Sequence, residues 1–215
     1  MKQFVVVGLG RFGSSVARTL TENEHNVLAI DTDEERVQNI ANEVTHAVEA
    51  DATDENALRT LGVRNFDVAI VSIGDNIHAN ILATLILKEL GVPYVVVKAQ
   101  DSLHGKVLSK VGADRVVYPE RDMGVRIAHN LISSNVLDYI EFAPDYSIVE
   151  IIAAKDMIGK SLAQVKFRSK FGVNVMAIKR GKELNITPGA NDKVLEGDVL
   201  IVMGKNEDLD KLKHL

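Results

Sequence analysis

No cysteine occurs among the 215 residues of this sequence. The absence excludes disulfide bridges, thiolate metal sites and cysteine nucleophiles, and it is compatible with a reducing cytoplasm. An excess of positive charge is missing as well, because the formal net charge is -5 at pH 7. Nucleic acid is therefore not expected as a partner, since binding it normally requires a clustered basic surface.

Long apolar runs are also missing. A membrane helix needs roughly 18 to 20 apolar residues, whereas the most apolar window, ANILATLILKEL, is shorter and contains Lys88 and Glu89. The chain begins directly with the strand-like QFVVVGLG and has none of the segments of a secretory signal peptide. We therefore expect a globular cytoplasmic protein that reaches a membrane only through a partner.

Short apolar runs alternate with amphipathic stretches between Gln3 and Glu120. The runs are FVVVG, VLAID, HAVEAD, VAIVSIG, YVVVKA and RVVYPE. Each is rich in valine or isoleucine and precedes a helical pattern, which is typical of repeated βαβ units. The pattern predicts an α/β fold with a Rossmann-type, doubly wound parallel sheet. Helices are expected over 11–22, 34–44, 54–62, 76–90 and 102–111.

A different pattern follows residue 120. Residues 121–137 predict one further helix with no parallel strand after it, and strand-like segments follow from IVEIIAA onward, with short helices near 161–166 and 206–213. The helix over 76–90 is apolar almost all round, so it is either buried on several sides or part of a subunit interface. We expect a Rossmann nucleotide-binding domain over 1–120, a crossover or dimerisation helix over 121–138, and a small α+β module over 139–215.

Three glycines suggest a phosphate-binding turn. Gly8, Gly10 and Gly13 complete G-x-G-x-x-G between an expected strand and an expected helix, where free backbone N–H groups and the helix dipole favour anions. Asp31 ends the next strand about 20 residues on, which is the usual place for a carboxylate that binds ribose hydroxyls. Its charge would repel a 2'-phosphate, so a nucleotide with a free 2'-hydroxyl is favoured over NADP.

Other candidates for this site lie at the ends of neighbouring strands, because ligands of open α/β sheets bind beyond the carboxyl ends of the strands. These candidates are Asp51, Ala52, Ile73, Gly74, Asp75, Lys98, Ala99 and Gln100.

Four residues each allow two interpretations. Asp33 is either the N-cap of the following helix or a ligand contact. Arg11 is either an exposed arginine at a helix start or a clamp on phosphate oxygens. Glu120 either caps the next helix or holds Mg²⁺ or Ca²⁺, ions that join carboxylates to phosphates. His104 is either a surface histidine or a nucleotide contact.

A reaction centre cannot be found beside this site. Tyr94 and Lys98 match Y-x-x-x-K, but they lie on an expected strand, where four residues span about 13 Å. The six histidines show no metal-ligand spacing, and no serine lies in G-x-S-x-G. These absences favour a nucleotide that acts as a signal. An NAD-dependent oxidoreductase using the same Rossmann site is the alternative.

Several longer motifs resemble one family. VVGLGRFG, ADATDE, IGDN, VVVKAQ, KVLSKVGADRVVYPERDMG and IAHNLISSNVLDYIE together resemble the RCK (KTN) family of cytosolic regulatory subunits of Ktr-type potassium transporters, over essentially the whole chain. Asp75 and His78 stand where the family pattern IGENIQAS has Glu and Gln.

The resemblance implies a non-enzymatic gating protein. Members form homodimers that assemble into an octameric ring at the inner face of the membrane, beneath a membrane potassium-translocating subunit. Their Rossmann site takes ATP or ADP and, less specifically, NAD(H). Arg11 would reach phosphate across the dimer, and Glu120 would bind the Mg²⁺ or Ca²⁺ that accompanies ATP.

The resemblance also implies two sets of site residues. The nucleotide set is Gly8, Gly10, Arg11, Phe12, Gly13, Asp31, Thr32, Asp33, Asp51, Ala52, Ile73, Gly74, Asp75, Lys98, Ala99, Gln100, His104 and Glu120. In many relatives the C-terminal module binds cyclic di-AMP between two subunits, and the residues implied for it are Ile158, Arg168, Asn174, Val175 and Pro188. The alternative for the second set is that these residues only pack a dimer.

Overall fold

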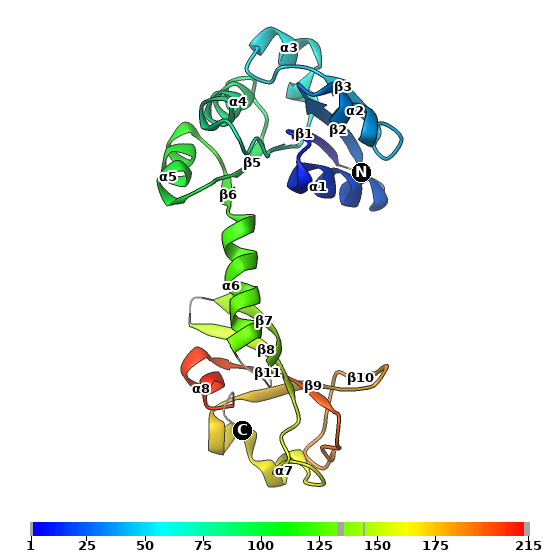
Figure 1. The fold of residues 1–215 in the computed structure, drawn as a ribbon, viewed down its shortest axis with the longest axis vertical. Helices are drawn as coiled ribbons and strands as arrows, with labels where there is room; N and C mark the ends of the chain where they lie inside the picture. The colour runs from blue at the N-terminus through cyan, green and yellow to red at the C-terminus, as the bar shows by residue number, and fades with distance from the viewer. Residues whose placement is uncertain (1, 133–135, 144, 213–215) are drawn as a thin grey trace. The chain divides into compact units, whose positions relative to one another are not determined.

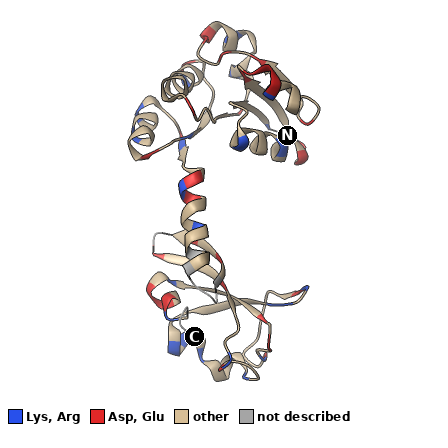
Figure 2. Ribbon diagram, viewed as in Figure 1, with Lys and Arg blue, Asp and Glu red and all other residues tan. Residues whose placement is uncertain are grey.

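A computed structural model describes residues 2–132, 136–143 and 145–212. The chain divides into two compact units, Met1–Pro119 and Glu120–Leu215, and each is considered by itself (Figure 1). Across the described residues, no helix combines the length and apolarity required to cross a membrane. Lys and Arg lie in short, separate segments interspersed with Asp and Glu in both units (Figure 2).

The first unit is built on a six-stranded parallel sheet with the order β3-β2-β1-β4-β5-β6. This order confirms the expected Rossmann-type fold. The strands are β1 (Gln3–Val7), β2 (Asn26–Asp31), β3 (His46–Glu49), β4 (Val68–Val71), β5 (Tyr94–Lys98) and β6 (Arg115–Val117).

Helices cover the two faces of this sheet unequally. On one face, α1 and α2 pack over β1 and β2 through Ala17, Val37 and Ile40. On the other face, α3, α4 and α5 pack over β1, β4 and β5. The helices are α1 (Arg11–Glu22), α2 (Glu34–Ile40), α3 (Glu55–Thr60), α4 (Ile77–Glu89) and α5 (Ser102–Val111), with a 3-10 turn at Val63–Asn65.

Side-chain caps begin most of these helices. Asp33, Asp54, Asn76 and Asp101 each accept a hydrogen bond from a backbone N–H in the first turn of α2, α3, α4 and α5. Helix α1 differs, because its N-cap is Gly10 and no side chain caps it.

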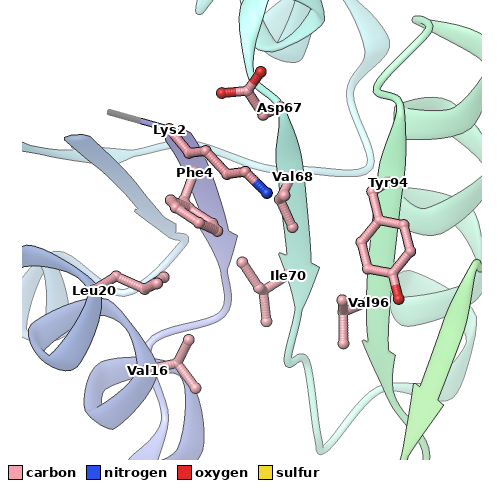
Figure 3. A pocket seen from close by; sticks show the side chains of 9 residues that line it. All are labelled: Lys2, Phe4, Val16, Leu20, Asp67, Val68, Ile70, Tyr94 and Val96. Carbon is pink, nitrogen blue, oxygen red and sulfur yellow. The ribbon is translucent and has the colours of Figure 1, made fainter. Parts of the chain in front are cut away.

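Part of the sheet on the α1 face borders a cavity of about 610 Å³ (Figure 3). Its floor consists of side chains of β1, β4 and β5, and α1 forms one wall. The helix that follows β6 belongs to the second unit from Glu120 onward. The lining residues are Lys2, Phe4, Val16, Leu20, Asp67, Val68, Ile70, Tyr94 and Val96.

The second unit contains a five-stranded antiparallel sheet with the order β10-β9-β11-β8-β7. Phe167, Phe171 and Leu200 are buried in its core. This sheet and its short helices confirm the expected small α+β module. The elements are α6 (Pro119–Ile132), β7 (Val136–Ala143), β8 (Tyr146–Ile152), α7 (Leu162–Val165), a π-helical turn (Phe167–Phe171), β9 (Asn174–Arg180), β10 (Glu183–Asn185), β11 (Val199–Lys205) and α8 (Asn206–Asp210).

The helix expected over 121–137 is wrong at its C-terminal end. Helix α6 ends at Ile132, residues 133–135 lie outside the described residues, and Val136 already belongs to β7. Strand β7, which the sequence interpretation missed, pairs with β8 from Val136 to Ala143. Pairing with a neighbouring strand is a nonlocal interaction, and here it overrides the helical spacing of the apolar residues.

Other boundaries shift less. Helix α2 ends at Ile40, whereas the expected helix ran to residue 44, and α8 ends at Asp210. The end of the helix expected over 206–213 lies partly outside the described residues.

An ion pair between an exposed arginine and a buried aspartate joins β9 to the segment before β11. The Asp198 carboxylate is fully buried and accepts hydrogen bonds from Arg180 Nε at 2.8 Å and Arg180 Nη2 at 2.9 Å. The Leu195 N–H donates to the same carboxylate at 2.8 Å. The hydrogen bonds from Arg180 are the main reason that the pKa of Asp198 lies below its ordinary value of 3.8.

A lowered pKa makes this pair's contribution to folding depend on pH. The folded carboxyl has the lower pKa, so its stabilisation is fully present above about pH 4 and is lost as the pH falls through the folded pKa. We expect Asp198→Asn to reduce the free energy of unfolding by about 2 kcal/mol at neutral pH, and by less near pH 3. Urea unfolding of both proteins at the two pH values measures this. An equal difference at both would contradict a charged Asp198.

Candidate nucleotide site

The glycine loop packs tightly where it joins β1 to α1. Gly8 has a φ of +91°, a conformation that favours glycine, and its N–H donates to the Ile30 carbonyl at 2.8 Å. A Cβ on Gly13 would lie 1.9 Å from the Gly8 carbonyl oxygen. The chain's own backbone therefore explains two of the three glycines of the motif.

Gly10 has a different environment. Its φ of -67° and ψ of -176° suit any residue, and a Cβ there would meet nothing within 4 Å. No acidic residue lies in the first turn of α1, and no side chain caps it. The positive end of the helix dipole thus faces open space beside a residue without a side chain, which is the arrangement that an anionic group such as phosphate requires.

Asp31 organises the loop from the end of β2. Its side chain is buried, with Oδ2 accepting from the Leu9 N–H at 2.6 Å and Oδ1 accepting from the Asp33 N–H at 3.0 Å. Arg36 Nη1 lies 3.6 Å from Oδ2. A carboxylate can accept about four hydrogen bonds, so the contact expected with ribose stays a prediction. The structural role of Asp31 in holding Leu9 was missed from the sequence.

Asp33 and Asp51 stabilise local turns. Asp33 accepts from the N–H groups of Glu35 and Arg36, so the N-cap interpretation is confirmed. Asp51 accepts from the N–H of Thr53 at 2.8 Å and from its hydroxyl at 2.7 Å. Thr32 is exposed between β2 and α2, and Ala52 is buried in the core.

Side-chain amides join the ends of β4 and β5. Asn80 Nδ2 donates to the carbonyl oxygens of Ile73 at 2.7 Å and Lys98 at 3.2 Å. Gln100 Nε2 donates to the Gly74 carbonyl oxygen. The two segments expected to contact the nucleotide, 73–75 and 98–100, are therefore brought together.

The glycine loop is joined to β4 as well. The Ser72 hydroxyl donates to the Gly8 carbonyl oxygen. Ser72 and Asn80 were missed from the sequence. The only signal for Asn80 was an amide within an otherwise apolar helix.

His104 is buried, with 4% of its surface exposed, so the surface interpretation is wrong. Nδ1 accepts from the Gln100 N–H at 3.3 Å, which leaves the ring hydrogen on Nε2, a buried atom without a hydrogen-bond partner in the structure. Burial lowers the pKa of His104 below 6.5, although the Asp101 carboxylate acts in the opposite direction. The ring is neutral at pH 7.

The remaining expected contacts differ in exposure and in the unit to which they belong. Arg11 is exposed at the first position of α1, and Phe12 packs partly against the α1 core. Asp75 is exposed before α4. Glu120 is the first residue of the second unit, so its contact with a nucleotide stays a prediction. Within the described residues, no group of three His, Asp or Glu side chains could hold a metal ion.

The second expected site centres on one side-chain pair. Arg168 Nε and Nη2 both donate to Asn174 Oδ1, at 3.1 and 2.9 Å, and join the π-helical turn to the start of β9. Ile158 is exposed, whereas Val175 and Pro188 are half-buried. The polar pair exposes a guanidinium and an amide that could bind phosphate or a base.

Comparison with known proteins covers almost the whole chain. The TrkA-N domain family matches residues 4–119 and the TrkA-C domain family matches residues 147–215. The sequence is 51% identical to the Ktr system potassium uptake protein C of Bacillus subtilis, over 99% of this chain and 96% of that protein. It is 47% identical to the Ktr system potassium uptake protein A of the same organism, with the same coverage.

A solved structure shares the fold. The crystal structure of the GsuK RCK domain aligns with a TM-score of 0.71 at 18% identity, and the alignment covers all of this chain and 47% of that one.

The contrast between Gly10 and Gly13 yields a test of the site. We expect Gly10→Ala to leave the free energy of unfolding within about 0.5 kcal/mol of the parent and to abolish stabilisation by ATP, because its methyl group enters only the space beside the loop. Gly13→Ala should lower stability by about 1–3 kcal/mol through overpacking. Thermal unfolding with and without ATP distinguishes them, and undiminished ATP stabilisation of Gly10→Ala would contradict phosphate binding here.

Proposed function

Since this chain belongs to the family of TrkA-N and TrkA-C domain proteins that contains the Ktr potassium uptake proteins, we propose that it is a nucleotide-responsive regulatory subunit of a potassium transporter. The 51% identical relative is a potassium uptake protein and not an enzyme, so the expectation of a non-enzymatic role is confirmed and the oxidoreductase alternative is dropped. The observation that carries the proposed regulation is the open end of α1 beside Gly10.

ATP or ADP is the proposed ligand of the first unit. Its phosphates would lie at the start of α1, and Arg11, exposed at that position, would bind them from its own or a neighbouring subunit. Asp31 disfavours a 2'-phosphate through its charge, and NAD(H) would bind less specifically. Glu120 would hold the Mg²⁺ or Ca²⁺ that accompanies ATP. A nucleotide that binds two conformations with different affinity shifts their populations, and this shift would switch transport.

A second copy of the chain is the proposed first partner. Met123, Ile127 and Leu131 recur every four residues on one side of α6, and between 50% and 81% of each is exposed. Leu82 and Leu85 of α4 are exposed as well, although Ile86 and Leu87 of the same helix are buried. Apolar rows that stay exposed among the described residues favour a homodimer, and two such surfaces would allow dimers to assemble further into an octameric ring.

The proposed location follows from the proposed partner. A membrane potassium-translocating subunit would hold the ring at the cytoplasmic face of the cell membrane.

In the second unit, Arg168 and Asn174 would contact cyclic di-AMP, with Ile158, Val175 and Pro188 beside them, so that a second ligand acts on the same assembly.

A ligand series tests the nucleotide proposal. By mass action, ATP or ADP at 100 times its Kd should raise the free energy of unfolding by about 2.7 kcal/mol, and NADPH should have the smallest effect. Arg11→Ala, at an exposed position, should weaken the effect of ATP without lowering the stability of the free protein. Thermal unfolding with ATP, ADP, NADH and NADPH, each with and without Mg²⁺, measures this. Steady consumption of NADH in the presence of a small substrate would contradict the proposal that the protein is a regulatory subunit.

The α6 row gives a test of self-association. A charge placed in an apolar interface must lose its water, so we expect Ile127→Asp to dissociate the dimer. Val125→Asp is the matched control, because Val125 is also exposed but lies about 160° around the helix from Ile127. Sedimentation velocity of the two variants and the parent gives the oligomeric state. A dimer that survives Ile127→Asp would exclude this row as the interface.

A further inference from the structure

A buried amide stands out on α4. Asn80 is completely buried, one turn before Ala83 and Thr84 on a helix side that otherwise packs mainly apolar residues against the sheet. Burying an amide is unfavourable unless its hydrogen bonds are made. Asn80 Nδ2 makes two, whereas Oδ1 has no hydrogen-bond partner in the structure. An apolar side chain would avoid this penalty, so the sheet packing alone does not explain an asparagine here.

The two acceptors of Nδ2 belong to different strand ends. One is the Ile73 carbonyl, which follows β4, and the other is the Lys98 carbonyl, at the last residue of β5. The backbone register between these strands ends at Val71 and Val97. Beyond that pair, the ladder no longer sets the separation of the two segments, and the Asn80 NH₂ group joins them from the buried side instead.

Both strand ends lie where the nucleotide is expected. Residues 73–75 and 98–100 follow the carboxyl ends of β4 and β5, where ligands of open α/β sheets bind, and Ser72 links the same edge to the Gly8 carbonyl of the glycine loop. Gln100 reinforces the junction from its exposed side by donating to the Gly74 carbonyl. Asn80 itself is fully buried beneath this edge, so it acts through the backbone that it holds.

We propose that Asn80 is a positioning residue of the nucleotide site, which sets the spacing of the β4 and β5 ends for an adenine nucleotide. The inference rests on the proposed function. When the strand ends are already held at the separation that the nucleotide requires, less conformational entropy is lost on binding. Loss of the Asn80 hydrogen bonds therefore lowers the affinity for the nucleotide even in a protein that remains folded.

The test compares Asn80→Ala with Thr84→Val in the full-length chain. Thr84 is the matched control, because it is equally buried and its hydroxyl donates to the Asn80 main-chain oxygen at 2.7 Å, but it bonds to neither strand end. Calorimetric titration with ATP, at a temperature where all proteins are folded, gives Kd. We expect Asn80→Ala to raise Kd by about tenfold or more, and Thr84→Val to leave it within about twofold.

Asn80→Asp supplies a readout that a purely structural role would not move. An ionised carboxylate donates no hydrogen bond, whereas a protonated carboxyl donates one, and burial raises the pKa of a carboxyl group. The Kd of Asn80→Asp, divided by the Kd of the parent at the same pH, should therefore decrease as the pH is lowered from about 8 to about 6. This variant also serves if Asn80→Ala fails to fold.

Each outcome decides the matter. If the parent binds ATP and Asn80→Ala binds it equally well, the positioning role is wrong and the proposed function stands. If Thr84→Val weakens binding as much as Asn80→Ala, general loosening of α4 explains both, and the positioning role is again wrong. If the parent binds neither ATP nor ADP, the proposed function and this inference fail together.

Discussion

The hydrogen bond from the Leu9 N–H to the buried Asp31 carboxylate is central to the candidate nucleotide site of the first unit. It fixes the glycine loop against the end of β2, while the second oxygen of the same carboxylate holds the turn into α2 through Asp33. From the other side, Ser72 joins the Gly8 carbonyl to β4. The loop is therefore ordered by groups of the chain itself, and the start of α1 is left open toward solvent.

Side chains at this edge mainly hold the protein's own backbone. The polar groups at the edge are largely occupied with one another: Gln100 with Gly74, Asp51 with Thr53, and the neutral His104 ring with the Gln100 N–H. These pairs order the backbone around the open start of α1. Under the proposed function, a ligand bound there with different affinity for two conformations would change their relative stability, which is the physical requirement for a regulator of a transporter.

The sequence was sufficient for features that depend on local pattern. Alternating runs predicted the parallel sheet, and the glycine spacing predicted the tight turn between β1 and α1, because strand, turn and helix propensities act over a few residues. Features set by distant neighbours were missed. Val136 and Leu137 joined a strand because β8 lies beside them, His104 is buried by packing, and the bond from Asn80 to Lys98 joins positions 18 apart. The nucleotide contacts themselves remain predictions, since a ligand is not part of the fold.

The half-covered sheet behind the cavity has a consequence for protein abundance. Phe4, Ile70 and Val96 line apolar surface there, on the face of the sheet against which α1 packs. A partner that covered this surface would bind only the folded chain and would stabilise it more strongly as its concentration rose. Copies without such a partner would unfold more often and be more exposed to proteases. The supply of partner would then adjust the number of copies that persist, a form of stoichiometric control that requires no change in synthesis.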